Sequence, residues 1–308
     1  MRAVTQDTFG GPEVLKTVEI DRPTPLGAEV LIRVHASGVN PVDVAVRSGA
    51  YPILGEPPFG VGWDISGVVE EVGPGARFKP GDEVYGMPFF PRAATGYAEY
   101  VAAPSRQVAR KPAGLDHVHA AALPLAGLTA WQGLVDAAQL EAGQRVLIHR
   151  AAGGVGHLAV QIAKVRGAHV IALASEPKHE FVRSLGADEV IDYRTTDYTE
   201  AVRDVDVVFD SSSQGTRSLE VLRPGGTLVS IMEHWNQELA AQIEAAGRRF
   251  AGVSVEPDYA ALEAIATLVD SGRIRPHVAE TFPLAEAAKA HELVESGRTQ
   301  GKVVLTID

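Results

Sequence analysis

A glycine-rich segment between a strand pattern and a helix pattern constrains the fold of this chain most strongly. Residues 145–149 read as a buried strand, and the sequence Ala-Ala-Gly-Gly-Val-Gly follows at 151–156. Apolar residues then recur at helical spacing up to Arg166, and Gly167 marks the end of that helix. Small residues in such a turn let the backbone turn tightly and let the helix pack closely on the strand. The segment therefore predicts a strand–turn–helix unit with open backbone N–H groups at the start of the helix.

The same alternation of strand and helix continues beyond this unit. Strand patterns recur at 169–174, 189–192, 205–210 and 226–231, with helix patterns at 177–185 and near 217–222. Residues 250–255 are expected as a last strand, and residues 258–271 as a helix that leaves the sheet. A series of this kind predicts an α/β fold, with a doubly wound parallel sheet of the Rossmann type.

The first 115 or so residues have a different texture, rich in strand and turn patterns. Residues 29–35 alternate between apolar and polar, and Gly-Pro turns recur at 10–12, 73–75 and 80–82, which suggests a small barrel or sandwich. The tail at 303–307 returns to strand texture, so we expect it to complete the N-terminal domain. The length of 308 residues suits about two domains. We predict a β-rich domain at 1–120 and 256–308 and a dinucleotide-binding domain at 121–255.

Composition excludes several classes of protein. Twenty-eight basic and 39 acidic residues give a net charge of −11, which argues against long-range attraction to nucleic acid or to an anionic membrane. The chain has no cysteine, so disulfides, thiolate nucleophiles and cysteine-containing zinc sites are excluded. The longest apolar run, 120–131, contains Pro124 and Gly127 and is too short to span a bilayer. No signal peptide is visible, and we expect a cytoplasmic protein.

The glycine-rich turn is the expected binding site for the pyrophosphate of a dinucleotide, through Ala152, Gly153, Gly154, Val155 and Gly156.

The end of the next strand indicates which dinucleotide is bound. An acidic residue there would bind a ribose 2′-hydroxyl, but the chain has Ser175, with Lys178 following on the first helical turn. A hydroxyl and an ammonium group suit a 2′-phosphate, which predicts NADPH rather than NADH. Glu176 would oppose a phosphate unless it points away. Ser175 could instead cap the helix, and Lys178 could be ordinary surface.

Several motifs, spread over nearly the whole length, resemble one family. The chain resembles the zinc-independent quinone oxidoreductases, the zeta-crystallin-like branch of the medium-chain dehydrogenase/reductase superfamily. The motifs are GVNPVD at 38–43, RSG at 47–49, GWDISGVVEEVG at 62–73, KPGDEV at 79–84, GLTAW at 127–131, AAGGVG at 151–156, LGA at 185–187 and GKVV at 301–304.

The resemblance implies a discontinuous GroES-like catalytic domain joined to a Rossmann domain, with NADPH as cofactor. It implies that Ser175, Lys178 and Tyr193 bind the 2′-phosphate, and that Asn40 and Asp43 line the active site. The remaining cofactor-binding residues that it implies are Thr129 near the nicotinamide, Ser211 and Ile231 along its ribose and ring, and Lys302 in the tail.

The chain differs from other members of the superfamily at three places. Zinc-dependent members have a Cys within the stretch that is 40–43 here, and a His-Glu pair where this chain has Trp63 and Asp64. We therefore expect no metal site, and Asp64 is either a site residue or a carboxylate that stabilises a turn. Many quinone reductases have a Tyr where this chain has Ala45, which puts the quinone itself in doubt.

Two further side chains near this segment have alternative interpretations. Tyr51 is retained as a candidate catalytic residue, although it could equally belong to a lid or to the packing. Arg47 could form a structural pair with Asp43 or contact the substrate.

Together with these residues, the resemblance implies hydride transfer from NADPH to a small electrophile, either a quinone or an α,β-unsaturated carbonyl. Asn40, Tyr51 and backbone N–H groups are the candidate donors to the developing oxyanion. One alternative is a reductase of enoyl thioesters or alkenals, and another is a non-catalytic NADPH- or RNA-binding protein. We expect a homodimer through the sheet edge at 250–255, because an open strand edge leaves backbone groups unpaired.

Overall fold

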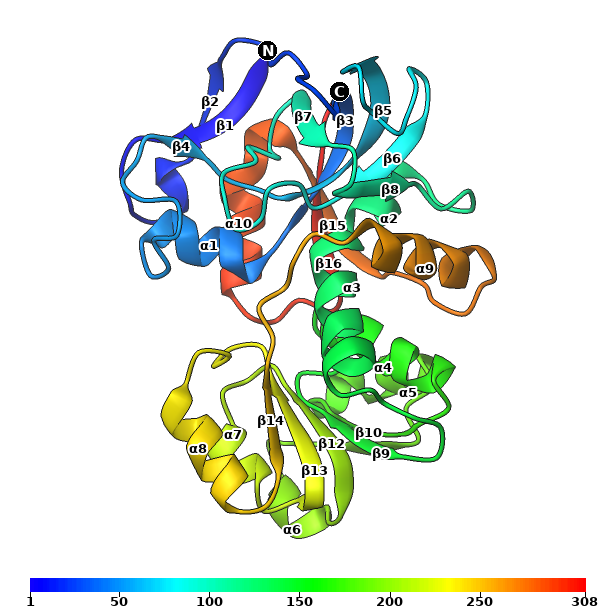
Figure 1. The fold of residues 1–308 in the computed structure, drawn as a ribbon. Helices are drawn as coiled ribbons and strands as arrows, with labels where there is room; N and C mark the ends of the chain where they lie inside the picture. Colours follow the sequence, from blue (N-terminus) through cyan, green and yellow to red (C-terminus); the bar gives the residue numbers. More distant parts are fainter. The chain divides into compact units, whose positions relative to one another are not determined.

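The computed structural model describes residues 1–308, and the chain divides into two units (Figure 1). Unit 1 comprises Met1–Leu128 and Glu256–Asp308, and unit 2 comprises Thr129–Val255. The first division lies eight residues later than the expected boundary at 120/121. The reason is that residues 117–121 form a helix that packs on strands of unit 1, and the backbone of Leu125 is bonded to Asp64 of unit 1.

Unit 2 contains the doubly wound parallel sheet that the sequence predicts. The strand order is β11-β10-β9-β12-β13-β14, and all neighbouring strands are parallel. The strands are β9 (Arg145–Ile148), β10 (His169–Leu173), β11 (Glu189–Ile191), β12 (Val205–Asp210), β13 (Leu222–Ser230) and β14 (Arg249–Gly252). The order reverses between β9 and β12, which is where sheets of this kind bind ligands beyond the carboxyl ends of their strands.

Helices cover both faces of this sheet, with α4 and α5 on one side and α7 and α8 on the other (Figure 1). The helices of unit 2 are α4 (Gly156–Val165), α5 (His179–Ser184), α6 (Tyr198–Ala201), α7 (Gly215–Ser218) and α8 (Gln237–Ala245). Leu147, Ile171 and Val208 of the central strands are fully buried in the core of this unit, together with Leu239 and Ile243 of α8.

Two sheets form unit 1. The smaller has the order β2-β1-β4, and the larger has the order β15-β16-β3-β5-β6-β8, with β7 also paired to β3. The strands are β1 (Arg2–Gln6), β2 (Lys16–Glu19), β3 (Glu29–Val39), β4 (Phe59–Gly60), β5 (Asp64–Val72), β6 (Glu83–Gly86), β7 (Tyr100–Pro104), β8 (Val108–Arg110), β15 (Val278–Pro283) and β16 (Lys302–Thr306). Since β16 pairs with β3, the C-terminal segment completes the N-terminal sheet, as the strand texture of the tail predicts.

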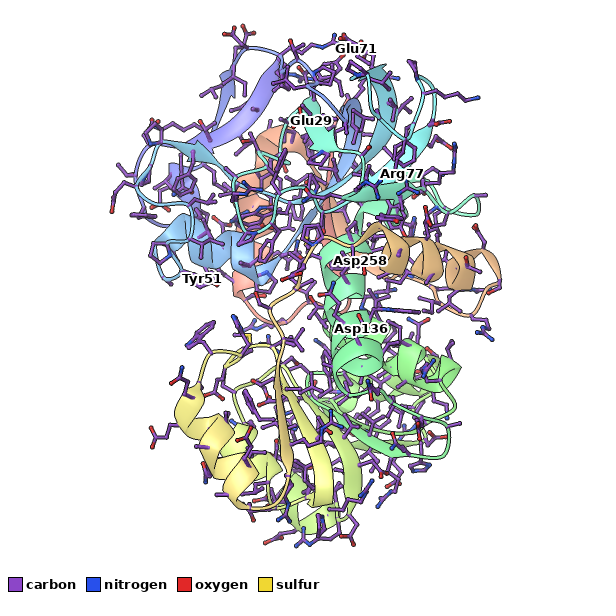
Figure 2. All side chains as sticks on the ribbon, in the orientation of Figure 1. Glu29, Tyr51, Glu71, Arg77, Asp136 and Asp258 are labelled. Carbon is purple, nitrogen blue, oxygen red and sulfur yellow. The ribbon has the colours of Figure 1, made fainter.

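The helices of unit 1 come from both of its chain segments. They are α1 (Pro41–Ser48), α2 (His117–Ala121), α9 (Tyr259–Asp270) and α10 (Ala287–Glu295), and α3 (Pro124–Trp131) begins in unit 1 and ends in unit 2. Figure 2 shows Asp258 at the start of α9, where its carboxylate accepts hydrogen bonds from the N–H groups of Ala260 and Ala261. This capping explains why the helix begins where the sequence pattern predicts.

Two element boundaries in unit 2 differ from the sequence prediction. The helix expected near 217–222 ends at Ser218, because Val221 already bonds to the sheet through Val205 N–H (3.0 Å), and β13 begins at Leu222. The last strand covers Arg249–Gly252 rather than 250–255. None of the helices combines the length and apolar composition needed to cross a bilayer.

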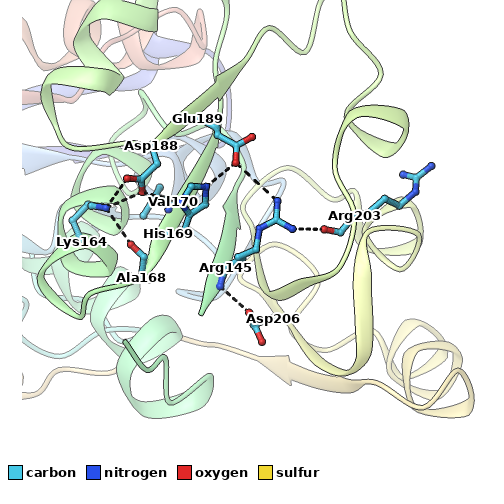
Figure 3. A network of polar contacts seen from close by, with 9 residues as sticks. All are labelled: Arg145, Lys164, Ala168, His169, Val170, Asp188, Glu189, Arg203 and Asp206. Atoms are coloured by element: carbon cyan, nitrogen blue, oxygen red, sulfur yellow. Dashed lines mark hydrogen bonds and ion pairs between the residues drawn. The ribbon is translucent and has the colours of Figure 1, made fainter. Parts of the chain in front are cut away.

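Ion pairs connect the amino ends of the parallel strands, at the end of the sheet opposite the glycine-rich turn (Figure 3). Lys164 Nζ lies 2.7 Å from Asp188 Oδ2, which also accepts a hydrogen bond from Val170 N–H (2.7 Å). Arg145 N–H donates to Asp206 Oδ2 (2.7 Å). The contacts of Asp188 join the starts of β10 and β11 to α4, and the contact of Arg145 joins the start of β9 to that of β12.

Candidate active site

The glycine-rich turn between β9 and α4 has an open helix N-terminus. Gly153 N–H donates to the carbonyl oxygen of Arg150 (2.8 Å), and the first bond of the helical turn runs from His157 N–H to Gly153 O (3.0 Å). The N–H groups of Gly154, Val155 and Gly156 have no partner in the chain. A Cβ atom on Gly156 would lie 2.2 Å from the carbonyl oxygen of Arg150, so only glycine fits there. This arrangement suits a phosphate group.

Three neighbouring strands end beside this turn. Ala151 N–H donates to Leu173 O at the end of β10, and Ala174 N–H donates to Ile191 O at the end of β11, both at 3.1 Å. These bonds hold the segments after β9, β10 and β11 next to one another. Candidate polar side chains follow each strand: Arg150 after β9, Ser175 and Lys178 after β10, and Tyr193 and Arg194 after β11.

The expected 2′-phosphate residues therefore lie at adjacent strand ends. The Ser175 side chain makes no capping hydrogen bond, so its hydroxyl is not used to start the helical turn Glu176–Lys178. Burial lowers the pKa of Lys178, and the positive charges of Arg150 and Arg194 lower it further. Three cations near one another are a feature expected of an anion site.

Sequence reasoning missed Arg150 and Arg194. The available signal was that each follows closely on a predicted parallel strand, on the same side of the sheet as Ser175. Arg150 also adopts a left-handed backbone conformation, with φ at 49°.

The residues expected near the nicotinamide lie either at strand ends or within a helix. They are Ser211, Ile231 and Thr129. Ser211 and Ile231 directly follow β12 and β13, and Ser211 Oγ donates to the carbonyl oxygen of His149 (3.0 Å). Ser211 thus lies at the reversal of strand order between β9 and β12. Thr129 is buried within α3, at the first position of unit 2.

Asn40 and Asp43 begin α1, where they form a capping box. Asn40 is the N-cap residue, Pro41 follows it, and Asp43 Oδ2 accepts a hydrogen bond from Asn40 N–H (2.7 Å). Asp43 is fully buried, and Asn40 is 2% exposed. Burial raises the pKa of Asp43 to about 7. The motif around Asn40 and Asp43 does not itself predict this part in starting the helix.

The Asn40 side chain belongs to a buried polar cluster with Asp64 and Lys302. Asn40 Nδ2 donates to Asp64 Oδ2 (2.9 Å), and Lys302 Nζ donates to Asn40 Oδ1, to Asp64 Oδ2 (3.2 Å) and to the carbonyl oxygen of Val39 (3.1 Å). The sequence predicts that Lys302 binds the cofactor. In the structure its ammonium group instead has three oxygen partners inside unit 1. Asp64 is more than a turn residue, since it connects three chain segments.

Two other expectations concern the segment around α1. Arg47 does not pair with Asp43; its guanidinium lies 2.6 Å from Glu295 Oε1 of α10. Tyr51 lies on the loop after α1, partly exposed, and its backbone N–H donates to Ala45 O (3.0 Å) (Figure 2). The structure thus brings Asn40 and Asp43 together at the start of this helix and Tyr51 beyond its end.

The residues at the family's zinc positions do not fit a zinc ion. Trp63 is fully buried, and its indole N–H donates to the carbonyl oxygen of Arg92 (2.7 Å), so it supplies no metal ligand. The Asp64 carboxylate is paired with the Lys302 ammonium group. No group of three or more His, Cys, Asp or Glu side chains in the chain is arranged to hold a metal.

Comparison with known families identifies the two parts of the chain. Residues 27–113 match the alcohol dehydrogenase GroES-like domain, and residues 185–305 match a family described as zinc-binding dehydrogenase. The human quinone oxidoreductase is 33% identical over 328 residues, which cover 100% of this chain and 98% of that protein.

Solved structures agree with these matches. The quinone oxidoreductase from Coxiella burnetii has a TM-score of 0.94 and 37% identity, over 100% of this chain and 99% of that one. The Escherichia coli quinone oxidoreductase, solved in complex with NADPH, has a TM-score of 0.89 and 31% identity, over 99% of this chain and 100% of that one. With the geometry above, these similarities define an NAD(P)H oxidoreductase. The chain belongs to the quinone oxidoreductase branch of the medium-chain dehydrogenase/reductase superfamily, as its motifs predict.

Proposed function

We propose that this enzyme transfers a hydride from NADPH to a quinone or an α,β-unsaturated carbonyl, and that it does so without zinc. The observation that carries the choice of NADPH is the group of cations at adjacent strand ends. Lys178, Arg150 and Arg194 lie close enough for the two arginines to lower the pKa of the lysine. A 2′-phosphate is the part of NADPH that NADH lacks, and it would be drawn to such a group.

The residues of unit 2 bind and orient the cofactor in this proposal. The free N–H groups of Gly154, Val155 and Gly156 hold the pyrophosphate at the start of α4. Ser175, Lys178 and Tyr193 hold the 2′-phosphate. The residues on the nicotinamide side are Thr129, Ser211 and Ile231. When bound, NADPH supplies a hydride from C4 of its nicotinamide ring.

The residues of unit 1 act on the acceptor. Negative charge develops on an oxygen of the acceptor as the hydride arrives. The chain has no cluster of side chains that could hold a metal ion to stabilise this charge. Hydrogen-bond donors must therefore do so, and the candidates are Asn40 and the hydroxyl group of Tyr51. Asp43 acts indirectly, because it fixes the backbone of Asn40 through the capping box.

A panel of acceptors tests the function. NADPH oxidation is followed with 1,4-benzoquinone, an alkyl enone and a crotonyl thioester, and each assay is repeated with NADH. We expect turnover with the quinone or the enone, and a lower KM for NADPH than for NADH. Turnover of the thioester alone would favour the enoyl-thioester reductase. Tight NADPH binding without any turnover would favour a non-catalytic protein.

We also propose that two copies pair through β14. This strand ends the sheet, so one of its edges has no neighbour within the chain. Met232 and Trp235, on the loop after β13, are 47% and 61% exposed. That loop lies against the end of β14, since a Cβ on Gly252 would be 2.2 Å from His234 O. An unpaired edge beside exposed apolar side chains suits a two-fold interface.

A further inference from the structure

We propose that Lys302, together with Asp64, fixes the side chain of Asn40 as a hydrogen-bond donor toward the carbonyl oxygen of the acceptor. Lys302 is then a positioning residue for the reaction rather than a cofactor ligand. This inference rests on the proposed function of Asn40. It concerns three side chains from three separate strand ends: Asn40 after β3, Asp64 at the start of β5 and Lys302 at the start of β16.

The chemistry of the partners determines the orientation of the Asn40 amide. An ammonium group only donates hydrogen bonds, so the Asn40 atom that Lys302 contacts must be the oxygen. A carboxylate only accepts, so the atom that faces Asp64 at 2.9 Å must be the nitrogen. Rotating the amide by 180° would break both contacts. One N–H of Asn40 Nδ2 remains without a partner in the chain, and that group can only donate.

The two partners are themselves held firmly. Asp64 Oδ1 accepts the N–H of Leu125 at the start of α3 (2.6 Å), which leaves Oδ2 for Asn40 and Lys302. Gly38 gives this cluster its space, since a Cβ there would lie 2.8 Å from Asp64 Oδ2 and 2.4 Å from Ala121 O. The Lys302 and Asp64 side chains are 4% and 0% exposed. Such a cluster resists rearrangement because a broken contact would leave a buried charge unpaired.

The same contacts strengthen Asn40 as a donor. The positive charge beside Oδ1 and the negative charge beside one N–H both favour the dipolar form of the amide, in which the nitrogen carries positive charge. Hydrogen bonds linked in this way polarise one another. The remaining N–H is therefore a better donor to a developing oxyanion than that of an isolated amide. The ammonium group thus supports the donor at a place where zinc-dependent members of the superfamily carry metal ligands.

The competing explanation is that Lys302 and Asp64 form an ion pair that only stabilises unit 1. Three variants separate the two explanations: Lys302→Met, Asn40→Ala and the double variant Lys302→Met/Asn40→Ala. For each we measure kcat with 1,4-benzoquinone, the Kd for NADPH by fluorescence titration, and the Tm. Lys302→Arg tests whether a conservative replacement restores turnover.

If Lys302 acts through Asn40, each single variant lowers kcat, by up to the roughly 100- to 1,000-fold cost of losing one oxyanion donor. The Kd for NADPH stays unchanged, and the double variant is no slower than Asn40→Ala alone. Lys302→Arg recovers a substantial part of kcat. If the two losses multiply in the double variant, or if Lys302→Met keeps the wild-type kcat, the inference is wrong.

Two further variants distinguish a loss of catalysis from a loss of stability. Lys111 is also buried, with 6% of its side chain exposed, and lies 3.5 Å from Glu83; Lys111→Met should lower Tm without changing kcat. Lys302→Met/Asp64→Asn removes both charges and should recover Tm, because no charge is left unpaired. Its kcat should stay low if the positioning role is correct, and should recover with Tm if the role is only structural. Absence of turnover in the wild type would instead refute the proposed function.

Discussion

The hydroxyl group of Tyr97 donates a hydrogen bond to Asp43 Oδ2 (2.8 Å), and both side chains are fully buried. The other carboxylate oxygen, Oδ1, is buried without a partner. His291 lies 3.2 Å from the same hydroxyl, and burial lowers the pKa of this histidine to about 3, so it brings no positive charge near neutral pH. The ionised form of Asp43 is therefore poorly compensated.

The stability of the fold should fall as the pH rises through the pKa of Asp43. Burial raises this pKa from 3.8 to about 7. Because the folded state holds the proton more tightly than the unfolded state, the stabilisation is complete below the unfolded value and is lost as pH rises past the folded value. The difference corresponds to about 4 kcal/mol of unfolding free energy. Urea denaturation between about pH 5 and pH 8 covers the larger part of this difference, and the comparison is with Asp43→Asn, which should lack the pH dependence.

Asp82 supplies the matched control for that measurement. Hydrogen bonds from Lys79 N–H and Arg110 outweigh its desolvation and lower the pKa of its carboxyl group. Its contribution to stability is therefore present above the unfolded pKa and is lost as pH falls through the lower folded pKa, which is the opposite sign. Asp82→Asn should leave the slope between about pH 5 and pH 8 unchanged. Equal slopes for wild type and Asp43→Asn would contradict the assignment to Asp43.

Cofactor preference should depend on the cations beside the glycine-rich turn. Lys178→Ala or Arg150→Ala should raise the KM for NADPH by about 10- to 100-fold, the range for losing a hydrogen bond to a charged group. The KM for NADH should hardly change, because NADH has no 2′-phosphate. Lys164→Ala is the control, since this cation lies at the other end of the sheet. Equal losses with both cofactors would exclude a 2′-phosphate site here.

Turnover should not require zinc. The indole of Trp63 is bonded to Arg92, and the Asp64 carboxylate is paired with Lys302, so neither is available as a metal ligand. Elemental analysis of the purified enzyme should find zinc well below one ion per chain. Incubation with a chelator should leave kcat unchanged. A tightly held equivalent of zinc that restores activity after its removal would refute the prediction.

Assembly should depend on the exposed loop beside β14. The double variant Met232→Asp/Trp235→Asp puts two charges at the proposed interface and should convert a dimer into a 32.6 kDa monomer. Static light scattering measures the mass. Leu26→Asp is the control, because Leu26 is 71% exposed but belongs to unit 1. A wild-type mass of 32.6 kDa would refute the dimer itself.

The hydroxyl group of Tyr51 should contribute to turnover. If it donates to the acceptor, Tyr51→Phe removes one hydrogen bond and should lower kcat/KM for the quinone by about 10-fold, with the Kd for NADPH unchanged. Tyr259→Phe is the control: this tyrosine is on α9, and Arg77 lies 4.0 Å above its ring. An unchanged kcat/KM in Tyr51→Phe would assign this residue to packing or to the loop.

The unit formed by β9, the glycine-rich turn and α4 could be predicted because its determinants are local. The close approach that requires glycine at 156 is to the carbonyl oxygen of Arg150, only six positions earlier. The hydrogen bonds that shape the turn likewise join residues three or four apart. A sequence pattern records such contacts directly, since the interacting residues appear within one short window.

The cluster around Lys302 could not be predicted in this way. Lys302 is 262 positions from Asn40 and 238 positions from Asp64, and the contacts exist only because β16 returns to pair with β3. The sequence shows only that Lys302 precedes the apolar run at 303–305. An ordinary surface lysine at the start of a strand would give the same pattern. The GKVV motif suggests a cofactor contact for Lys302, whereas its ammonium group contacts oxygen atoms of unit 1.

The ion pairs of Figure 3 have a practical consequence for protein engineering. They lie at the amino ends of the parallel strands, whereas Arg150, Ser175 and Lys178 follow the carboxyl ends. The two sets share the rigid strands between them but no side-chain contact. A library that randomises the carboxyl-end positions to change cofactor preference would leave the opposite network intact. Conversely, thermostabilising substitutions could be collected around Lys164 and Asp188 and transferred unchanged among variants with different cofactor preferences.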